Sequence, residues 1–260
     1  MLKIQSFKPE YSLCNFIKSY SIIDMNHKVE TYKKTILPFN ETCLAFIVTS
    51  NKENNSYNKC TTGIYLCPPS AKTHDMDLYK DFFYVDVSFY PGVLHEVFSI
   101  PFDKLKDRAY SIEELSINID TNILEQIHIN RENKGKIVDI LNAYFFKLFY
   151  NFQESSFLLN IKNLYLNCEL DEFFDNSKLS IRQIQRNMNK FTGLTPRTIQ
   201  RISRFNKILN NIKNCKSGNM ALVYKNYDFY DQSHLLKEFK SFSGLSCKEF
   251  MTDNTKYLQF

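Results

Sequence analysis

The 260-residue chain has no tryptophan, only six glycines and no long apolar run. So few glycines leave little material for a backbone cradle around phosphates, and no P-loop, G-x-S-x-G, H-E-x-x-H or dinucleotide-binding motif occurs. No segment approaches the roughly 20 consecutive apolar residues that a membrane span requires. We therefore expect a globular protein with no membrane partner, no enzymatic activity and no cofactor.

Cysteine is present, but in a pattern that favours neither disulfides nor zinc. The seven cysteines are odd in number and scattered, and no two form a C-x-x-C pair, so the thiols are expected to stay reduced. The first residues, Met1 to Lys8, contain no apolar signal segment, which favours a cytoplasmic protein. The ligand-type residues between His74 and Asp77, together with His95, do not share one face, and we expect no metal site.

Positive charge is concentrated in the C-terminal part of the chain. Residues 160–260 contain 16 Lys+Arg against 9 Asp+Glu, whereas the whole chain has a net charge of only +5. No acidic residue occurs between Asp175 and Asp228. A polyanion is the natural partner for such a field, because each neutralised phosphate releases condensed counterions. A solvated basic face is the alternative, but an internal repeat favours nucleic acid.

The basic part repeats itself with an offset of 51 residues. Residues 180–197 (SIRQIQRNMNKFTGLTPR) align with residues 231–248 (DQSHLLKEFKSFSGLSCK). Each copy begins with a residue that favours the N-cap of a helix, Ser180 or Asp231. Gln183 stands three residues after Ser180 and completes a capping box. The repeat therefore predicts one capped helix in each copy.

The same pattern predicts where each helix ends and which side it buries. Gly193 and Gly244 suit the left-handed conformation that ends a helix. New helices are expected to begin at Thr195–Pro196 and at a second capping box, Ser246–Glu249. The apolar positions expected to face the core are Ile181, Ile184 and Met188 in the first copy, and Leu235 and Phe239 in the second.

A short helical segment and a tight turn precede each copy, at residues 170–179 and 221–230, which is the order of a helix-turn-helix. The segment YDFYDQSHLLKEFKSFSGLS (residues 227–246) and the first copy, with TGLTP at residues 192–196, resemble the signature of the AraC/XylS family of bacterial transcription regulators. The resemblance covers about residues 164–252. It implies a tandem helix-turn-helix domain that binds double-stranded DNA.

Three residues depart from the family pattern. Asp228 stands where the family usually has glycine, Tyr224 where it has a small alanine, and Cys247 where it has proline. Aspartate tolerates a positive φ, so a turn at Asp228 can form. The departures leave open a second interpretation: a non-catalytic, small-molecule-sensing protein with a degenerate second helix-turn-helix and weak or single-groove DNA binding.

Arg182, Gln185 and Arg186 lie on the side of the first repeat helix that is opposite its core positions. Arginine can bind guanine, and glutamine adenine, with two hydrogen bonds. By resemblance these three residues contact bases, and the matching positions in the second helix are Gln232, Ser233, Leu236 and Lys237. Leu236 can offer only apolar contact to a thymine methyl. Candidate phosphate contacts at or near helix starts are Arg197, Thr198, Arg201 and Lys240.

The N-terminal half predicts a mixed, strand-rich domain. Runs of β-branched and aromatic residues predict strands over residues 35–49, 63–69 and 82–89. Helices are expected over residues 93–99, after Pro101, and from a capping box at Ser111–Glu114. Through Ile36-Leu-Pro38 and the segments 88–94 and 99–115, this half is similar to the sensor-like domain of a subset of AraC-type regulators. The abundant Phe and Tyr side chains either line an effector pocket or fill the core.

Residues 134–152 predict an amphipathic connecting helix whose apolar stripe is either buried against the N-terminal domain or forms a dimer interface. We therefore predict an α+β protein: a β-rich, sensor-like domain at 1–130, a connecting helix and linker at 131–160, and an all-α tandem helix-turn-helix domain at 161–260. The predicted function is transcription regulation through two adjacent major grooves, with no catalytic residues. RNA polymerase, a second copy of the chain and a small-molecule effector are candidate partners that the resemblance implies.

Overall fold

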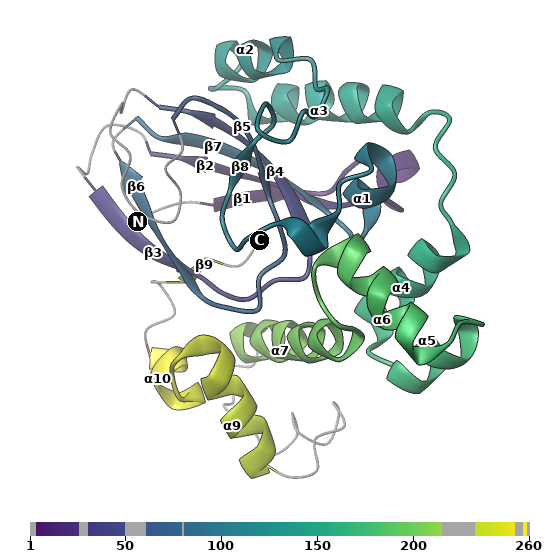
Figure 1. Cartoon of the computed structure of the whole chain (residues 1–260). Coiled ribbons are helices and arrows are strands. Elements are labelled where there is room, and N and C mark those ends of the chain that lie inside the picture. Colours follow the sequence, from purple (N-terminus) through teal and green to yellow (C-terminus); the bar gives the residue numbers. More distant parts are fainter. Residues whose placement is uncertain are drawn as a thin grey trace.

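A β-rich N-terminal half and a helical C-terminal half make up the molecule (Figure 1). The computed structural model describes residues 4–25, 31–49, 61–79, 81–214, 232–252 and 257–258. Within these residues, strands dominate up to Ser111 and helices dominate after it. The arrangement confirms the predicted α+β class, in which a β-rich part precedes an all-helical one.

The larger sheet has six strands in the order β1-β2-β7-β4-β5-β8, and every neighbouring pair is antiparallel. Its strands are β1 (Ile4–Phe7), β2 (Ile17–Asp24), β4 (Thr42–Val48), β5 (Gly63–Cys67), β7 (Phe83–Phe89) and β8 (Tyr110–Ser111). Side chains alternate between the two faces of a strand. The odd-numbered side chains of β7, from Phe83 to Phe89, therefore face one hydrophobic core. The even-numbered Tyr84 faces a second hydrophobic core on the other side of the sheet.

A smaller sheet covers the second of these faces. It consists of β6 (His74–Tyr79), β3 (Thr31–Ile36) and β9 (Tyr257–Leu258) in that order. Met76 and Leu78 of β6 are buried in the same core as Tyr84 of the larger sheet. β9, from the other end of the chain, runs parallel to β3.

Helices cover the opposite face of the larger sheet (Figure 1). They are α2 (Asn122–Ile129) and α3 (Lys134–Phe149), and shorter elements, α1 (Val93–Phe98) and the 3-10 helices η1 (Tyr11–Leu13) and η2 (Phe102–Lys104), complete this half. Four positions of α3 are buried against the sheet: Ile137, Leu141, Phe145 and Phe149. Of the two interpretations of this stripe, burial against the N-terminal domain accounts for these four positions.

The C-terminal helices surround a second core. They are α4 (Ser156–Asn167), α5 (Leu170–Asn176), α6 (Ile181–Thr192), α7 (Pro196–Asn214), α9 (Gln232–Ser243) and α10 (Cys247–Thr252). Ile199 and Phe205 of α7 are buried at the centre of this core, which also contains Phe239 of α9. Leu37, from the N-terminal half, is buried in it as well. The two halves therefore share apolar packing.

The apolar run within residues 35–49 forms the predicted buried strand, β4, whereas Thr35 and Ile36 belong to β3, because the chain leaves the sheet around Pro38, which has no backbone N–H to donate. One local prediction was wrong. The capping box at Ser111 does form: its N–H donates to Glu114 Oε2 at 2.9 Å, and the Glu114 N–H donates to Ser111 Oγ at 3.2 Å. No helix follows it, because the chain continues in turns with Ser116 at a φ of 52°.

Phe145→Ala should lower the free energy of unfolding by about 3–5 kcal/mol, because it removes a fully buried ring between α3 and the larger sheet. That ring lies 5.3 Å from the ring of Phe89. The matched control is Phe146→Ala, whose side chain is 45% exposed and whose loss should change stability by about 0.5 kcal/mol or less. Urea unfolding followed by circular dichroism measures both variants. Equal losses would contradict the placement of α3.

Candidate nucleic-acid interface

The first helix-turn-helix unit, residues 170–192, consists of a helix, a short turn and a second helix, α5 and α6, and α7 follows at once. The second unit is predicted over residues 221–243. The Ser180 N–H donates to Gln183 Oε1 at 2.9 Å, and the Gln183 N–H donates to Ser180 Oγ at 3.4 Å. Gly193 ends α6 with a φ of 70°, and α7 begins at Pro196. The predicted capping box, helix end and helix start are therefore confirmed.

The second repeat reproduces the first at the level of single hydrogen bonds. The Thr192 hydroxyl donates to the carbonyl of the residue four earlier at 2.8 Å and accepts from the N–H of the residue two later at 3.1 Å. At the equivalent position in α9, the Ser243 hydroxyl makes the same two bonds at 2.8 and 3.1 Å. Gly193 and Gly244 both have a positive φ, 70° and 75°. The repeat in the sequence is thus a repeat in the structure.

The predicted base-contacting side chains of the first unit lie on the exposed face of α6. The buried residues of α6 are Ile184, Met188 and Thr192, and the exposed ones include Arg182, Gln185 and Arg186. The expectation that Ile181 is buried in the core is wrong, because its side chain is 64% exposed. Ile181 lies on the same side of α6 as Ile184 and Met188, and its exposure shows that the first turn of the helix is not covered by the described residues.

α9 divides its residues in the same way. Leu235 and Phe239 are buried. The exposed side chains on its other side include Ser233, Lys237 and Lys240. Leu236, which stands where α6 has Gln185, is 37% exposed. The described part of α9 therefore presents the predicted contact residues to solvent, as α6 does.

Part of the second unit lies outside the described residues. These include Tyr224, Asp228 and the side chain of Gln232, the residue at which α9 begins. Cys247 is described, and its side chain is buried where α10 begins. The predicted capping box at Ser246–Glu249 is present there, with hydrogen bonds of 2.8 and 3.2 Å.

The four candidate phosphate contacts differ in their surroundings. Arg197 and Lys240 are exposed, and Thr198 is half-buried. The Arg201 Nε donates to Glu238 Oε1 of α9 at 3.2 Å, and its guanidinium carbon lies 4.9 Å from the centre of the Phe242 ring. Arg201 therefore joins α7 to α9, and its phosphate contact stays a prediction. Glu238 also lies 3.5 Å from His234 Nε2, which occupies the same surface of α9.

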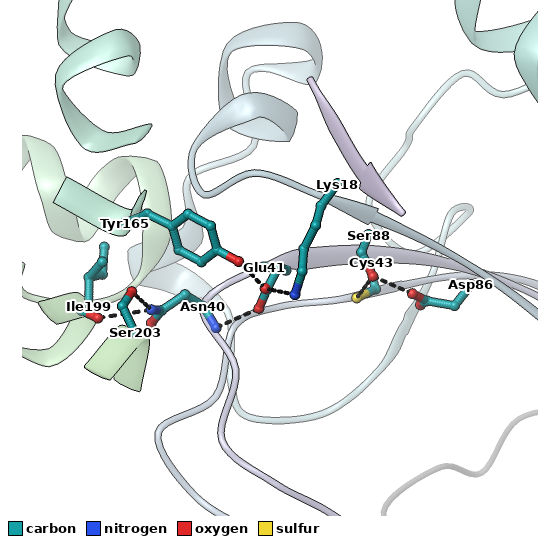
Figure 2. A network of polar contacts seen from close by, with 9 residues as sticks. All are labelled: Lys18, Asn40, Glu41, Cys43, Asp86, Ser88, Tyr165, Ile199 and Ser203. Atoms are coloured by element: carbon teal, nitrogen blue, oxygen red, sulfur yellow. Dashed lines mark hydrogen bonds and ion pairs between the residues drawn. The ribbon is translucent and has the colours of Figure 1, made fainter. Parts of the chain in front are cut away.

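The turn between β3 and β4 carries a polar network that reaches the helical half (Figure 2). Glu41 is 2% exposed, and its carboxylate accepts hydrogen bonds from Lys18 of β2, from the Tyr165 hydroxyl of α4 at 2.5 Å and from the Asn40 N–H at 3.0 Å. The fully buried Asn40 donates from Nδ2 to a backbone carbonyl of α7 at 2.9 Å and to Ser203 Oγ at 2.8 Å. The turn thus holds both α4 and α7.

Glu41 and Lys18 are both charged in this network. Burial alone would raise the pKa of Glu41, but the Lys18 ammonium and the Tyr165 hydroxyl hold it below the usual value. Burial opposes the charge of Lys18, yet the neighbouring Glu41 raises the pKa of Lys18 above normal. Losing one partner of a buried pair leaves an uncompensated charge, so such a pair restricts the positions of the elements that carry it.

A second group of contacts, from α1 and η2, packs on the side of α6 opposite its exposed face. His95 of α1 is buried, with its ring centre 4.2 Å from that of Phe191 in α6. A Cβ added to Gly193 would come within 3.2 Å of the Phe102 carbonyl oxygen, so η2 packs closely on the end of α6. Phe191 lies on the side of α6 opposite Arg182. The N-terminal half therefore contacts the first unit without covering its exposed face.

A buried carboxylate, Asp86, lies beside this network in the larger sheet (Figure 2). It accepts hydrogen bonds from the Ser88 hydroxyl at 2.5 Å and from the Tyr84 hydroxyl at 3.2 Å. Burial raises the pKa of Asp86 to about 6, although these donors act to lower it. Cys43 of β4 lies 3.7 Å from the Ser88 hydroxyl.

The metal-ligating residue types of the N-terminal half have other partners. His74 Nε2 lies 2.6 Å from the Ser70 hydroxyl and 3.1 Å from Asp107 Oδ1, and Asp75 pairs with Lys33 at 2.9 Å. No group of three potential metal ligands occurs within the described ranges. None of the helices described is long and apolar enough to cross a membrane.

Residues 5–111 match a family described as a domain of unknown function, DUF6597. No curated protein shows significant similarity to the chain. Among solved structures, the chain is similar to ToxT from Vibrio cholerae O395, with 15% identity, 92% of this chain and 98% of that chain covered, and a TM-score of 0.41. ToxT is an AraC-family regulator, the family that the basic half resembles.

Two further structures of ToxT from Vibrio cholerae show the same likeness. A structure in the P21 crystal form has 10% identity and a TM-score of 0.42, with 97% of each chain covered. Unsaturated fatty acid-bound ToxT from strain SCE256 has 11% identity and a TM-score of 0.39, with 96% of this chain and 94% of that chain covered. All three TM-scores lie below 0.5.

Tyr165→Phe should lower the free energy of unfolding by about 1.5–3 kcal/mol, because it removes a hydrogen bond to the buried, ionised Glu41. The ring, which lies 5.6 Å from Tyr90, is retained. The control is Tyr150→Phe, whose side chain is 72% exposed and whose change should stay within about 0.5 kcal/mol. If chemical denaturation gives Tyr165→Phe the stability of the wild type, the network does not join the two halves as described.

Proposed function

We propose that the chain is a sequence-specific transcription regulator of AraC type that binds double-stranded DNA. The structural repeat carries this proposal. α6 and α9 expose equivalent positions, 182 and 233, 185 and 236, 186 and 237, and 189 and 240, while positions 184 and 235 and 188 and 239 are buried. Two equivalent helices with exposed polar and cationic faces suit entry into major grooves.

The side chains of the first unit favour direct readout of bases. Arg182 and Arg186 can each bind guanine through O6 and N7, and Gln185 can bind adenine through N6 and N7. The proposed base contacts of the second unit are Gln232, Ser233 and Lys237. Gln232 can bind adenine as Gln185 does, but serine and lysine lack the planar two-donor geometry of arginine, so the first unit carries more of the sequence information.

Phosphate contacts complete the interface. The proposed contacts are Arg197, Thr198, Arg201 and Lys240. Arg197 stands near the beginning of α7, where unpaired backbone N–H groups also favour an anion. The interval between Asp175 and Asp228 contains no acid that would repel the phosphates. This interval supports DNA as the partner, because phosphate neutralisation supplies much of the binding free energy.

Two adjacent major grooves on one face of DNA are the proposed target. α7, which links the two units, has 19 residues, and it spans roughly 28 Å at about 1.5 Å per residue. Successive major grooves on one face lie about 34 Å apart. A linking helix of this length, with the width of the helices that it supports, suits such a spacing.

In this proposal the N-terminal part of the chain regulates DNA binding. Residues 1–130 form the regulatory domain, residues 131–160 the connection, and residues 161–260 the DNA-binding domain. A small-molecule effector that alters packing at the β3–β4 turn would alter the position of α7 and with it α6. A second copy of the chain and RNA polymerase are the further proposed partners. The chain acts in the cytoplasm and catalyses no reaction.

Inserting five base pairs between the two halves of the bound site should abolish most specific binding, because it turns one half-element to the opposite face of the DNA. The site is first obtained by selecting bound sequences from random duplexes with the full-length chain. Electrophoretic mobility shifts then compare the original and expanded sites, with a five-base-pair insertion outside the site as control. Retained affinity in the expanded site would show that only one unit reads DNA.

Arg186→Ala should reduce affinity for the selected site by about 1–3 kcal/mol and relax the preference at one base position. Arg197→Ala should instead weaken specific and random DNA equally and reduce the salt slope by about 0.9. Both side chains are exposed, so neither change should unfold the chain. Fluorescence anisotropy over a range of salt concentrations measures these effects, and identical behaviour of the two variants would reject the assigned roles.

A further inference from the structure

We propose that Glu238 is a positioning residue for DNA binding, which holds the Arg201 guanidinium in the orientation in which it contacts a phosphate. This inference rests on the proposed function and adds an acidic residue to an interface made of cations. An acid in a DNA-binding helix ordinarily weakens binding, because its charge repels the phosphates. The surroundings of Glu238 assign it a different role.

Glu238 stands at the boundary between the buried and the exposed sides of α9. It follows the exposed Lys237 and precedes the buried Phe239, and its own side chain is 11% exposed. One carboxylate oxygen, Oε1, accepts a hydrogen bond from Arg201 Nε at 3.2 Å. The other, Oε2, lies 3.5 Å from His234 Nε2. The carboxylate therefore lies between a cation of α7 and the imidazole of His234.

The guanidinium of Arg201 is held by two neighbours. Its carbon lies 4.9 Å from the centre of the Phe242 ring, and that buried ring lies 5.2 Å from the ring of Phe205, centre to centre. Guanidinium groups stack on aromatic rings, which restricts their tilt, and the hydrogen bond from Nε to Glu238 restricts their rotation. The two terminal nitrogens take no part in this hydrogen bond, and the Arg201 side chain is 42% exposed. These nitrogens can therefore donate to a phosphate.

Arg201 lies on the side of α7 that carries Arg197. The two arginines stand four residues apart, and residues at this spacing share a helix face. Arg197, one turn nearer the beginning of α7, is exposed. A phosphate backbone that passes Arg197 therefore also passes close to the guanidinium that Glu238 holds.

The first unit has no equivalent of this ion pair. The repeat places Asn187 of α6 at the position of Glu238, and both residues are half-buried. An uncharged amide forms no ion pair with an arginine, so the positioning contact belongs to the second unit. That unit offers fewer two-donor side chains to the bases, and an ordered phosphate contact fixes its register on the duplex.

Charge alone and positioning predict opposite results for Glu238→Ala. If only charge mattered, removing an acid would strengthen DNA binding. Because the change releases the Arg201 guanidinium, we expect the affinity for the selected site to fall about fivefold and the salt slope to fall by about 0.9, the contribution of one phosphate contact. Glu238→Gln keeps an oxygen that can accept from Nε, so it should retain the affinity and the salt slope of the wild type. Fluorescence anisotropy of the full-length chain between about 50 and 200 mM salt measures both quantities.

The Arg201→Ala variant shows whether Glu238 acts through Arg201. In that background Glu238→Ala should cause no further loss of affinity and no further fall in the salt slope. The matched control is Glu172→Ala, which removes an exposed acid from α5 in the first unit and should not weaken binding. Circular dichroism verifies that each variant is folded.

The inference is overturned if Glu238→Ala binds DNA as tightly as the wild type or more tightly. It is also overturned if Glu238→Gln loses as much affinity as Glu238→Ala, or if the losses of Glu238→Ala and Arg201→Ala add in the double variant. A wild-type chain that binds no duplex DNA would instead overturn the proposed function itself.

Discussion

The buried carboxylate of Glu41 is the constraint that fixes the two halves of the molecule relative to each other. An ionised carboxylate can be buried only if donors replace its water, and two of its donors come from β2 and α4. Tyr165 lies 124 residues from Glu41 in the sequence. The position of the β3–β4 turn is set by these partners. Asn40, in the same turn, then meets α7.

α7 connects the β3–β4 turn to both repeats through direct contacts. Ser203 faces the turn, whereas Arg201, two residues earlier, is paired with Glu238 of α9. Gln200 donates to the Cys168 carbonyl at the end of α4 at 2.7 Å. One continuous helix therefore contacts the N-terminal half, the first unit and the second unit. The turn at Gly193 joins α6 to the beginning of α7, and Arg201 of α7 pairs with Glu238 of α9, so both helices are positioned by α7.

The helical half was predictable from sequence because its signals are local. Ser180 and Gln183 mark a helix start, and Gly193 marks an end, within a few residues of one another. β5 and β7 were predictable as apolar runs. β2 was not, because residues 17–24 (IKSYSIID) mix polar and apolar side chains, and the strand is buried on both faces by other elements.

The candidate site was predictable where exposure follows from helical spacing, as it does for Arg182 and Arg186. Ile181 was assigned to the core because it precedes Ile184 by three residues, but no described neighbour covers the first turn of α6. The sequence around Glu41 and Asn40 did not indicate that these residues contact the helical half. They look like ordinary turn residues, and their importance depends on partners more than a hundred residues away.

The β3–β4 segment is also the place where the second unit meets the N-terminal half. Thr35 and Ile36 pair with Tyr257 and Leu258 in β9, and Tyr257 lies 4.9 Å from Phe250 of α10, ring centre to ring centre. Four residues after Ile36, the side chain of Asn40 holds α7. The first unit is therefore tied to this segment through α7 and the second through β9. This one segment therefore contacts elements that adjoin both repeats, so its position and the placement of α6 and α9 depend on each other.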